Sequence, residues 1–318
     1  MADKIGRREF IKQSAAVGAS AVLGNRLISS LADGPLSALA ADKIDIAVAS
    51  GSDYAAMTAK AVELVGGMEK FVHKGSKVAL LPNVQSKNPG TFTKPEILRS
   101  VIRMCKKAGA GEINCLSWLT QQHWDGAGLA QVVQEEGITL KLIPKDDVNF
   151  KSVLITGGNV LQEAKILNEF FNHDVFINMP ITKNHVGNKF TGTMKNLMGL
   201  NAPSLNRAQF HKPNWQTDPA AIEHLDRCIA DLNTVIKPSL CIVDATEIIK
   251  TNGPMGPGEL IKPLKVIAGV DRVAIDSYCA TILGLKGEDI VHIRGAYEKK
   301  MGEIDLKKVK IQEIKVLP

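Results

Sequence analysis

The sequence lacks the cysteine patterns that bind metals and iron–sulfur clusters. Five cysteines are spread over 318 residues, and no two of them form a C-x-x-C pair. They are Cys105, Cys115, Cys228, Cys241 and Cys279. This spacing gives no sign of a zinc ribbon, and we expect no cysteine-ligated iron–sulfur cluster. Most of the five lie in apolar periodic segments, which favours buried thiols, while an exported protein would leave disulfide pairing open.

A second absence is that of long hydrophobic runs. The weakly apolar stretch over residues 15–24 is much shorter than the roughly 20 residues that a transmembrane helix needs. No other stretch is a candidate, so we expect no stable membrane anchor. The formal net charge is +6 and falls to about +4 without residues 1–40. This small excess of positive charge does not indicate nucleic-acid binding.

The N-terminal segment has the architecture of a signal peptide. Arg7 and Arg8 are followed by Phe10 and Lys12, then by the weakly apolar stretch and the small-residue sequence Ala-Leu-Ala at 38–40. This pattern resembles a twin-arginine signal. We therefore expect residues 1–40 to engage the twin-arginine translocation machinery, and residues 41–318 to be exported, for example to a periplasm. The alternative is an amphipathic N-terminal helix.

Predicted strands and helices alternate along the rest of the chain. We expect strands at residues 44–49, 77–83, 112–118, 139–144, 174–180, 239–249 and 264–270. Helices are expected at residues 54–66, 93–109 with Thr93 as the N-cap, 129–136, 160–171, 218–236 and 271–284, before a last helix and strand. This order is typical of an α/β fold in which helices cover both faces of a mostly parallel sheet. A second lobe would begin near Asn214.

Acidic residues are missing from one long segment. The 43 residues at 175–217 contain no Asp or Glu, yet they hold five Lys or Arg residues and two histidines. The densest part, "KNHVGNKFTGTMKN" at 183–196, directly follows a predicted strand. Ligands of open parallel sheets bind beyond the carboxyl ends of the strands. The segment therefore predicts a site for phosphate or carboxylate, with free amides of a helix start near Thr191–Thr193 as further anion contacts. A solvated basic loop is the alternative.

Other polar motifs also follow predicted strands. They contain Asn83, His123 with Asp125, Asp244, and Asn252. Lys195 stands out because it lies about one turn into a predicted helix among other cations, where its charged form is disfavoured. Asp276 lies between apolar helix residues, so it is either a buried polar tie to the site or an ordinary helix residue.

Several segments resemble a known family. "KFVHKGSKVALLPN", "TKPEILRSVIRMCKKAGA", "INMPITKNHVGNKFTGTMKNLMGL", "IVDATEIIKTNGPMGPG" and "VIAGVDRVAIDSYCATILGL" look like successive blocks of the family catalogued as domain of unknown function 362. The resemblance covers about Asp45 to Ile311. Members of that family usually have a lysine just before Pro82-Asn83, where this sequence has Leu81. Some members carry iron–sulfur modules, whose cysteines are missing here.

The order of elements also resembles the nickel-pincer-nucleotide lactate racemases. Those enzymes have a histidine, a lysine that holds the cofactor covalently, and a nickel-ligating histidine along one stretch. His185, Lys195 and His211 stand in the same order here, and His123 follows a strand as another catalytic histidine does there. The resemblance implies nickel or a nickel-pincer nucleotide as a cofactor.

Three hypotheses follow. The first is an enzyme of racemase or isomerase type that acts on a small anionic substrate. In this enzyme His185 and His123 transfer protons, His211 binds the metal, and the cofactor or anion contacts are Lys195, Lys183, Asn196, Asn83 and Thr193. The second is a non-catalytic periplasmic protein that binds an anion. The third is an accessory subunit of a redox complex.

Overall fold

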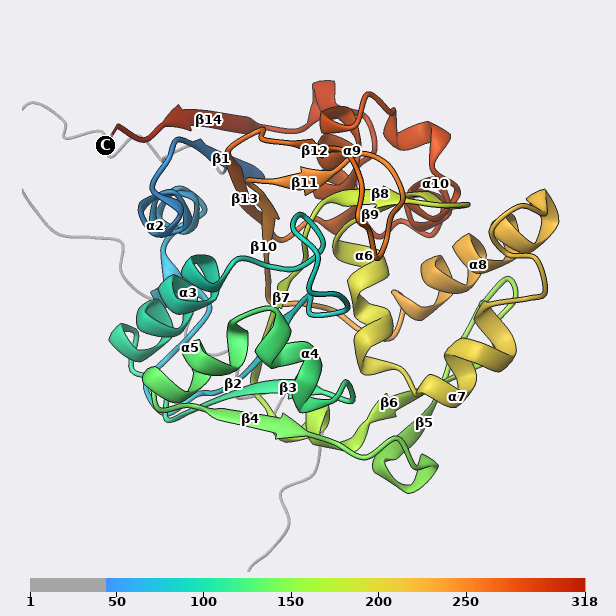
Figure 1. The fold of residues 1–318 in the computed structure, drawn as a ribbon, viewed down its shortest axis with the longest axis horizontal. Coiled ribbons are helices and arrows are strands. Elements are labelled where there is room, and N and C mark those ends of the chain that lie inside the picture. The colour runs from blue at the N-terminus through green and yellow to red at the C-terminus, as the bar shows by residue number, and fades with distance from the viewer. Residues whose placement is uncertain (1–43, 318) are drawn as a thin grey trace, which may run out of the picture. The chain divides into compact units, whose positions relative to one another are not determined.

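An eight-stranded sheet forms the centre of the structure, a computed structural model that describes residues 44–317 (Figure 1). The proposed signal peptide at residues 1–40 lies outside these residues. The spatial order of the strands is β14 (Ile311–Lys315), β1 (Ile46–Ser50), β13 (Lys265–Gly269), β10 (Leu240–Ala245), β7 (Val175–Met179), β2 (Lys77–Pro82), β3 (Glu112–Ser117) and β4 (Thr139–Leu142).

Seven of these strands run in one direction. The pairs from β10 through β7, β2 and β3 to β4 are parallel, and so is β1 with β14. β13 is the exception, because it pairs antiparallel with both β1 and β10. The prediction of a mostly parallel α/β sheet is confirmed. The carboxyl ends of β2, β3, β7 and β10 therefore meet at one edge of the sheet.

Helices cover both faces of the sheet, as predicted. Alternate residues of a strand point to opposite faces, and in β1 Ile46 and Val48 join one apolar cluster while Ala47 and Ala49 join the other. Figure 1 shows α2 (Tyr54–Leu64), α3 (Pro95–Lys107) and α5 (Leu129–Glu135) on one side, and α8 (Pro219–Leu232), α9 (Arg272–Ile282) and α10 (Val291–Glu298) on the other. All five cysteines are buried and free.

Shorter elements complete residues 44–317. The remaining helices are η1 (Met68–Lys70), α4 (Gln121–Gly126), η2 (Asp147–Asn149), η3 (Asn168–Asn172), α6 (Thr193–Asn196), η4 (Leu197–Leu200), α7 (Pro203–Leu205), η5 (Asn206–Phe210), η6 (Gly287–Asp289) and η7 (Leu306–Lys308). Three two-stranded sheets pair β5 (Phe150–Leu154) with β6 (Glu163–Leu167), β8 (Lys183–His185) with β9 (Lys189–Thr191), and β11 (Ile248–Ile249) with β12 (Leu260–Ile261). No helix within this range is long and apolar enough to span a bilayer. Asn214 lies in a turn before α8, and the lobe boundary near it stays a prediction.

The predicted helix over residues 160–171 is wrong. Residues 163–167 form β6, which pairs antiparallel with β5, and a short 3-10 helix follows. In this stretch Ala164 and Ile166 are buried while Glu163 and Lys165 are half-exposed, which is the alternation of a strand. A short apolar run of this kind fits both the spacing of a helix and the alternation of a strand, and the pairing with β5 decides for the strand.

Thr93 is not the N-cap of α3, contrary to the prediction. The N-cap is Lys94, whose amide donates to the buried carboxylate of Asp244, 2.8 Å away. The hydroxyl of Thr93 instead accepts from the amide of Asn83 and donates to the carbonyl of Met179. Thr93 therefore ties the ends of β2 and β7 together, directly below the edge where ligands are expected.

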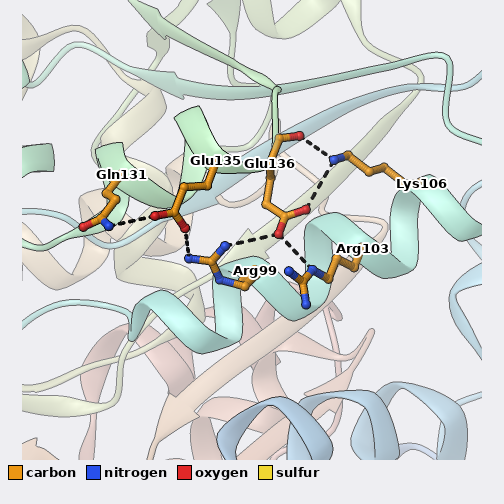
Figure 2. A network of polar contacts seen from close by, with 6 residues as sticks. All are labelled: Arg99, Arg103, Lys106, Gln131, Glu135 and Glu136. Carbon is orange, nitrogen blue, oxygen red and sulfur yellow. Dashed lines mark hydrogen bonds and ion pairs between the residues drawn. The ribbon is translucent and has the colours of Figure 1, made fainter.

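A polar network joins α3 to the end of α5 (Figure 2). Arg99 and Arg103 donate to the carboxylate of Glu136 over 3.2 and 2.8 Å, and Lys106 also pairs with it. Burial raises the pKa of Glu136, but the hydrogen bonds from Arg103 and Lys106 outweigh burial, so this pKa lies below its ordinary value. The network fixes two helices on the face of the sheet that carries α2.

Candidate functional site

A cavity of about 380 Å³ lies at the carboxyl ends of β2 and β3. Its walls come from residues 81–85, from residues 117–119, from positions between 185 and 216, and from the loop residues Pro254 and Met255. The volume is within the range of pockets that bind small molecules. The cavity thus occupies the edge of the sheet at which the sequence predicts a ligand.

Five of the eight predicted site residues line this cavity. They are Asn83, His185, Lys195, Asn196 and His211. The other three, His123, Lys183 and Thr193, are not among the lining residues. The predicted segment therefore lies at the cavity, but the side chains of these three residues do not line it.

His123 lies on α4, beyond the loop that lines the cavity. Residues 117–119 form part of the cavity wall, but the chain then turns into α4. The ring of His123 is half-exposed, and its Nδ1 is 2.9 Å from the hydroxyl of Thr120. The structure does not bring His123 together with His185.

Lys183 is fully buried below the cavity. Its Nζ donates to the carbonyl of Thr91 over 2.8 Å and to Oδ1 of Asn83 over 3.2 Å. Burial lowers the pKa of Lys183 to about 7, and the positive charge of Lys195 acts in the same direction. Lys183 therefore orients Asn83 from behind, because a lysine can only donate and the amide must present its oxygen to it.

Asparagine side chains form a buried ladder under the cavity floor. Nδ2 of Asn83 donates to Oδ1 of Asn196, and Nδ2 of Asn196 donates to Oδ1 of Asn178 and to the carbonyl of Leu81. Nδ2 of Asn178 donates to the carbonyl of Thr193. The ladder links β2, β7 and α6, so Asn83 and Asn196 are held rigidly. Sequence reasoning missed Asn178, although an amide inside the apolar strand "VFINM" is a signal of such a role.

The start of α6 is closed by a carboxylate of the protein itself. Asp276, fully buried on α9, accepts from the amides of Thr193 and Met194 over 2.6 and 3.0 Å. The prediction that these amides are free for an anionic ligand is wrong, because Asp276 occupies them. Of the two interpretations of Asp276, the structure supports the buried polar tie. Gly192 is needed at this point, since a Cβ there would lie 2.4 Å from Oδ1 of Asp276.

Lys195, the third residue of α6, reaches the cavity. It is 9% exposed, and its Nζ has only long contacts, 3.5 Å to Oδ1 of Asn188 and 3.9 Å to the sulfur of Met198. Burial lowers the pKa of Lys195 to about 8, while the carboxylate of Asp226 acts in the opposite direction. An ammonium group with weak internal partners is well suited to donate to a ligand.

His185 and His211 pack against the same tryptophan. Their ring centroids lie 5.5 and 4.8 Å from that of Trp215, which sequence reasoning missed. Nδ1 of His185 bonds the carbonyl of Val186, and Nδ1 of His211 bonds that of Asn206. Burial lowers the pKa of both rings, and the charge of Lys195 lowers it further. Because Nδ1 donates to a carbonyl, Nε2 carries the lone pair, as in a general base or a metal ligand.

The charges around the cavity are of one sign. Lys195 and Arg207 line it, and no Asp or Glu is among the lining residues. The acid-free segment of the sequence supplies both cations. The site therefore has a positive potential in a partly water-excluded space, where charge interactions are stronger than in bulk water.

Comparison with known proteins gives the family. A family model described as a domain of unknown function (DUF362) matches residues 78–281, more than half of the chain. The chain belongs to this family. A thylakoid-associated protein of Synechocystis sp. is 28% identical to the DUF362 chain over 233 residues, which are 70% of this chain and 68% of that protein.

Two solved structures show a distant likeness to the DUF362 chain. One is the lactate racemase apoprotein from Thermoanaerobacterium thermosaccharolyticum, with a TM-score of 0.44, 14% identity, and coverage of 80% of this chain and 57% of that one. The other is a protein from Thermotoga maritima, with a TM-score of 0.39, 14% identity, and coverage of 66% and 55%. The DUF362 chain thus spans less than two thirds of either solved chain.

The donors in the cavity limit the metals that it suits. Within residues 44–317, no group of three His, Cys, Asp or Glu side chains could hold a metal ion. A bare nickel ion therefore does not fit the site. His211 and the amine of Lys195 line the same cavity and are the groups that would hold a cofactor that brings its own metal ligands. Such a cofactor would supply a metal centre that polarises a substrate.

Proposed function

We propose that this DUF362 protein is an enzyme that binds a small organic anion in the cavity and moves a proton on it. The observation that carries the proposal is the combination of Lys195 with the neutral imidazole of His185 in one cavity that no carboxylate lines. Racemases and isomerases are the reaction classes that this pairing suits, because they need a base and a fixed positive charge.

The anion would contact Lys195 and the rigid amide of Asn83. Nδ2 of Asn83 has two hydrogens, of which one is donated to Asn196, so the second is available to a ligand. Trp118, Met198 and Met255 supply apolar wall for the body of the molecule. This distribution suits a carboxylate or phosphate that is joined to a short apolar or hydroxylated group.

His185 would be the base. Its Nε2 lone pair accepts a proton from a carbon or hydroxyl of the substrate, and the negative charge left on the substrate is stabilised by Lys195. The protonated ring exchanges its proton with solvent and then returns a proton to another face or atom of the substrate, so the reaction consumes no proton overall. His211 would contact the substrate or a bound cofactor through its own Nε2. We also propose that the protein acts after export through the twin-arginine route.

Binding is tested with a panel of small carboxylates and organic phosphates, by thermal shift and calorimetry. We expect at least one of them to raise the melting temperature. Lys195→Met should weaken its binding by about 10-fold or more, since a charge-assisted hydrogen bond is lost. Lys212→Met, which removes an exposed lysine of the same acid-free segment, is the matched control and should change little. The anion site is refuted if no anion binds, or if both variants bind alike.

Proton transfer is tested in D2O with the anions that bind. We expect deuterium to enter the substrate with wild-type protein, detected by NMR or mass spectrometry. His185→Gln should abolish this exchange while changing affinity by only a few-fold. Binding without any exchange would instead favour a non-catalytic anion-binding protein.

A bound cofactor is tested with protein purified from its native host. Intact mass and metal content would show an adduct that Lys195→Met lacks.

A further inference from the structure

A buried chain of hydrogen bonds leads away from Lys195. Its first member is Asn188, in the turn between β8 and β9, with Oδ1 at 3.5 Å from Nζ of Lys195. The second is Asp226 on α8, whose Oδ1 accepts from Nδ2 of Asn188 over 2.6 Å. The third is His292 on α10, with Nδ1 at 2.5 Å from the same oxygen. Asn188, Asp226 and His292 are each at most 2% exposed, so the chain is shielded from bulk water.

Asp226 determines how Asn188 faces Lys195. A carboxylate can only accept, so it must bind the NH2 end of the Asn188 amide. The oxygen end of that amide then points to Lys195, as it must to interact favourably with an ammonium group. Reversal of the amide would place two donors against each other at Lys195 and two acceptors against each other at Asp226. Asp226 therefore controls, through one intervening side chain, the partner that Lys195 meets.

His292 holds Asp226 in place from the opposite direction. Because Asp226 can only accept, Nδ1 of His292 must carry a hydrogen and donate it. The ring of His292 is also stacked on Phe190, with centroids 6.2 Å apart, which limits its rotation. The carboxylate is thus bonded on one oxygen by two groups from different elements and has little freedom to move.

The other carboxylates on the helices around α6 have different partners. On α8, Glu223 pairs with Arg227, and Asp231 pairs with Lys299. On α9, Asp276 accepts from the first amides of α6. The lysine, arginine and histidine side chains on the elements around α6 are Lys183 and His185 on β8, Lys189 on β9, Arg207 on η5, His211 after η5, His224 and Arg227 on α8, and Arg272 on α9. Of the carboxylates on α8 and α9, Asp226 is the one connected to Nζ of Lys195.

We propose that Asp226 is a positioning residue that acts through Asn188 as the counter-charge of Lys195, keeping its side chain cationic and directed at the cavity. The proposal deepens the proposed function and rests on it, since it explains how a buried lysine stays ready for an anion. Burial alone would disfavour the cation. The internal carboxylate offsets this effect without entering the cavity, where it would repel the ligand.

The ionisation of Lys195 is the direct test. Lysines of the full protein are reductively methylated with 13C, and the Lys195 signal is assigned as the one that Lys195→Arg shifts or removes. We expect Asp226→Asn to lower the titration midpoint of Lys195 by on the order of half a pH unit. Glu223→Gln, an exposed carboxylate on the same helix, is the matched control and should leave the midpoint unchanged. An unchanged midpoint in Asp226→Asn overturns the proposal.

Anion affinity gives a second readout. With an anion that binds wild-type protein, Asp226→Asn should weaken binding about three-fold at pH 8.5 and hardly at all at pH 6.5, as follows from a half-unit shift. A double variant, Asn188→Asp with Asp226→Asn, moves the carboxylate next to Lys195. It should restore the midpoint to the wild-type value or higher, which a purely structural role of Asp226 would not predict. A double variant whose midpoint stays as low as that of Asp226→Asn contradicts the proposal.

The two proposals fail in different ways. If Lys195→Met binds anions as well as wild-type protein does, the proposed function fails, while the titration of Lys195 still reports on Asp226. If Lys195→Met loses binding but the midpoint is the same in wild type and Asp226→Asn, the anion site stands and the role of Asp226 is refuted.

Discussion

Lys183 is an unusual residue, a fully buried lysine whose partners are uncharged. It bonds only oxygen atoms of Thr91 and Asn83, and burial lowers its pKa to about 7. In the unfolded chain the pKa of Lys183 has the ordinary lysine value of about 10.4. Between these two values the unfolded state binds more protons, so the free energy of unfolding rises with pH.

This reasoning gives a prediction for Lys183→Met. From pH 7 to 9, the free energy of unfolding of wild-type protein should rise relative to the variant by up to about 1.4 kcal/mol per pH unit. Urea unfolding at several pH values measures the difference. Lys195 contributes with the same sign in both proteins, so most of its contribution cancels in the comparison. Lys74→Met removes an exposed lysine and is the control. A difference between wild type and Lys183→Met that does not change with pH would contradict the assignment.

Residue types revealed which segment lines the cavity, but they did not reveal where each side chain points. Asn83, His185 and Lys195 were predicted because polar groups after buried strands converge at one edge of a parallel sheet. Lys183 is a lysine like Lys195 and lies in the same segment, yet its side chain points below the cavity toward Thr91. That partner lies 92 residues away in the chain, and no local pattern encodes such a contact.

At the scale of elements, the site depends on α6, which has only four residues. So short a helix is not stable by itself. Its first amides are bonded by Asp276, and the carbonyl of Met194 accepts from Asn233 on the far side. Tertiary contacts therefore position Lys195, and helix propensity contributes little.

Asp276→Ala should accordingly cost more than removal of an ordinary helix cap. It leaves two buried amides without an acceptor, and we expect a loss of about 3 kcal/mol in the free energy of unfolding. Asp53 caps α2 in the same chemical way, accepting from the amide of Ala56, but at the surface. Asp53→Ala should cost about 1 kcal/mol. Denaturant unfolding of both variants checks this, and equal losses would show that burial of the cap has no effect.

Elements with strong local signals were predictable, whereas those defined by pairing were not. Asp53 and Asp271 cap α2 and α9, and in α3 buried residues such as Ile97, Val101 and Cys105 recur at helical spacing. By contrast, β6 was mistaken for a helix because its pairing with β5 is invisible in a short apolar run. Thr93 was mistaken for a cap because its true partners are Asn83, directly after β2, and Met179 on β7.

At the scale of the whole molecule, the reversed strand β13 was the main feature that the sequence did not reveal. Its apolar run "KVIAG" looks like that of a parallel strand, since every central strand is buried on both faces. The direction of β13 is set by the preceding hairpin. β12 runs antiparallel to β11, and only three residues connect β12 to β13, so the chain re-enters the sheet antiparallel to β10. The parallel direction of the other strands agrees with the alternation of helices and strands in the sequence.

The proposed export is also a property of the whole molecule. If residues 1–40 act as a twin-arginine signal, replacing Arg7 and Arg8 by lysine should retain most of the protein in the cytoplasm. Fractionation of cells that express wild-type and variant protein measures the distribution. Lys4→Arg together with Arg26→Lys changes two residues outside the pattern, conserves the charge of the segment and serves as the control. Equal export of the Arg7/Arg8 variant would contradict a twin-arginine route.

The bond between Asp276 and the start of α6 has a consequence for the energetics of recognition. A helix start whose amides bind only a ligand anion tends to be poorly ordered without that anion. Ordering the helix start then reduces the net free energy of binding. Here an internal anion has already ordered the helix during folding. The conformational entropy of the lysine-bearing segment is lost once, when the chain folds, and does not have to be lost again for each ligand that enters.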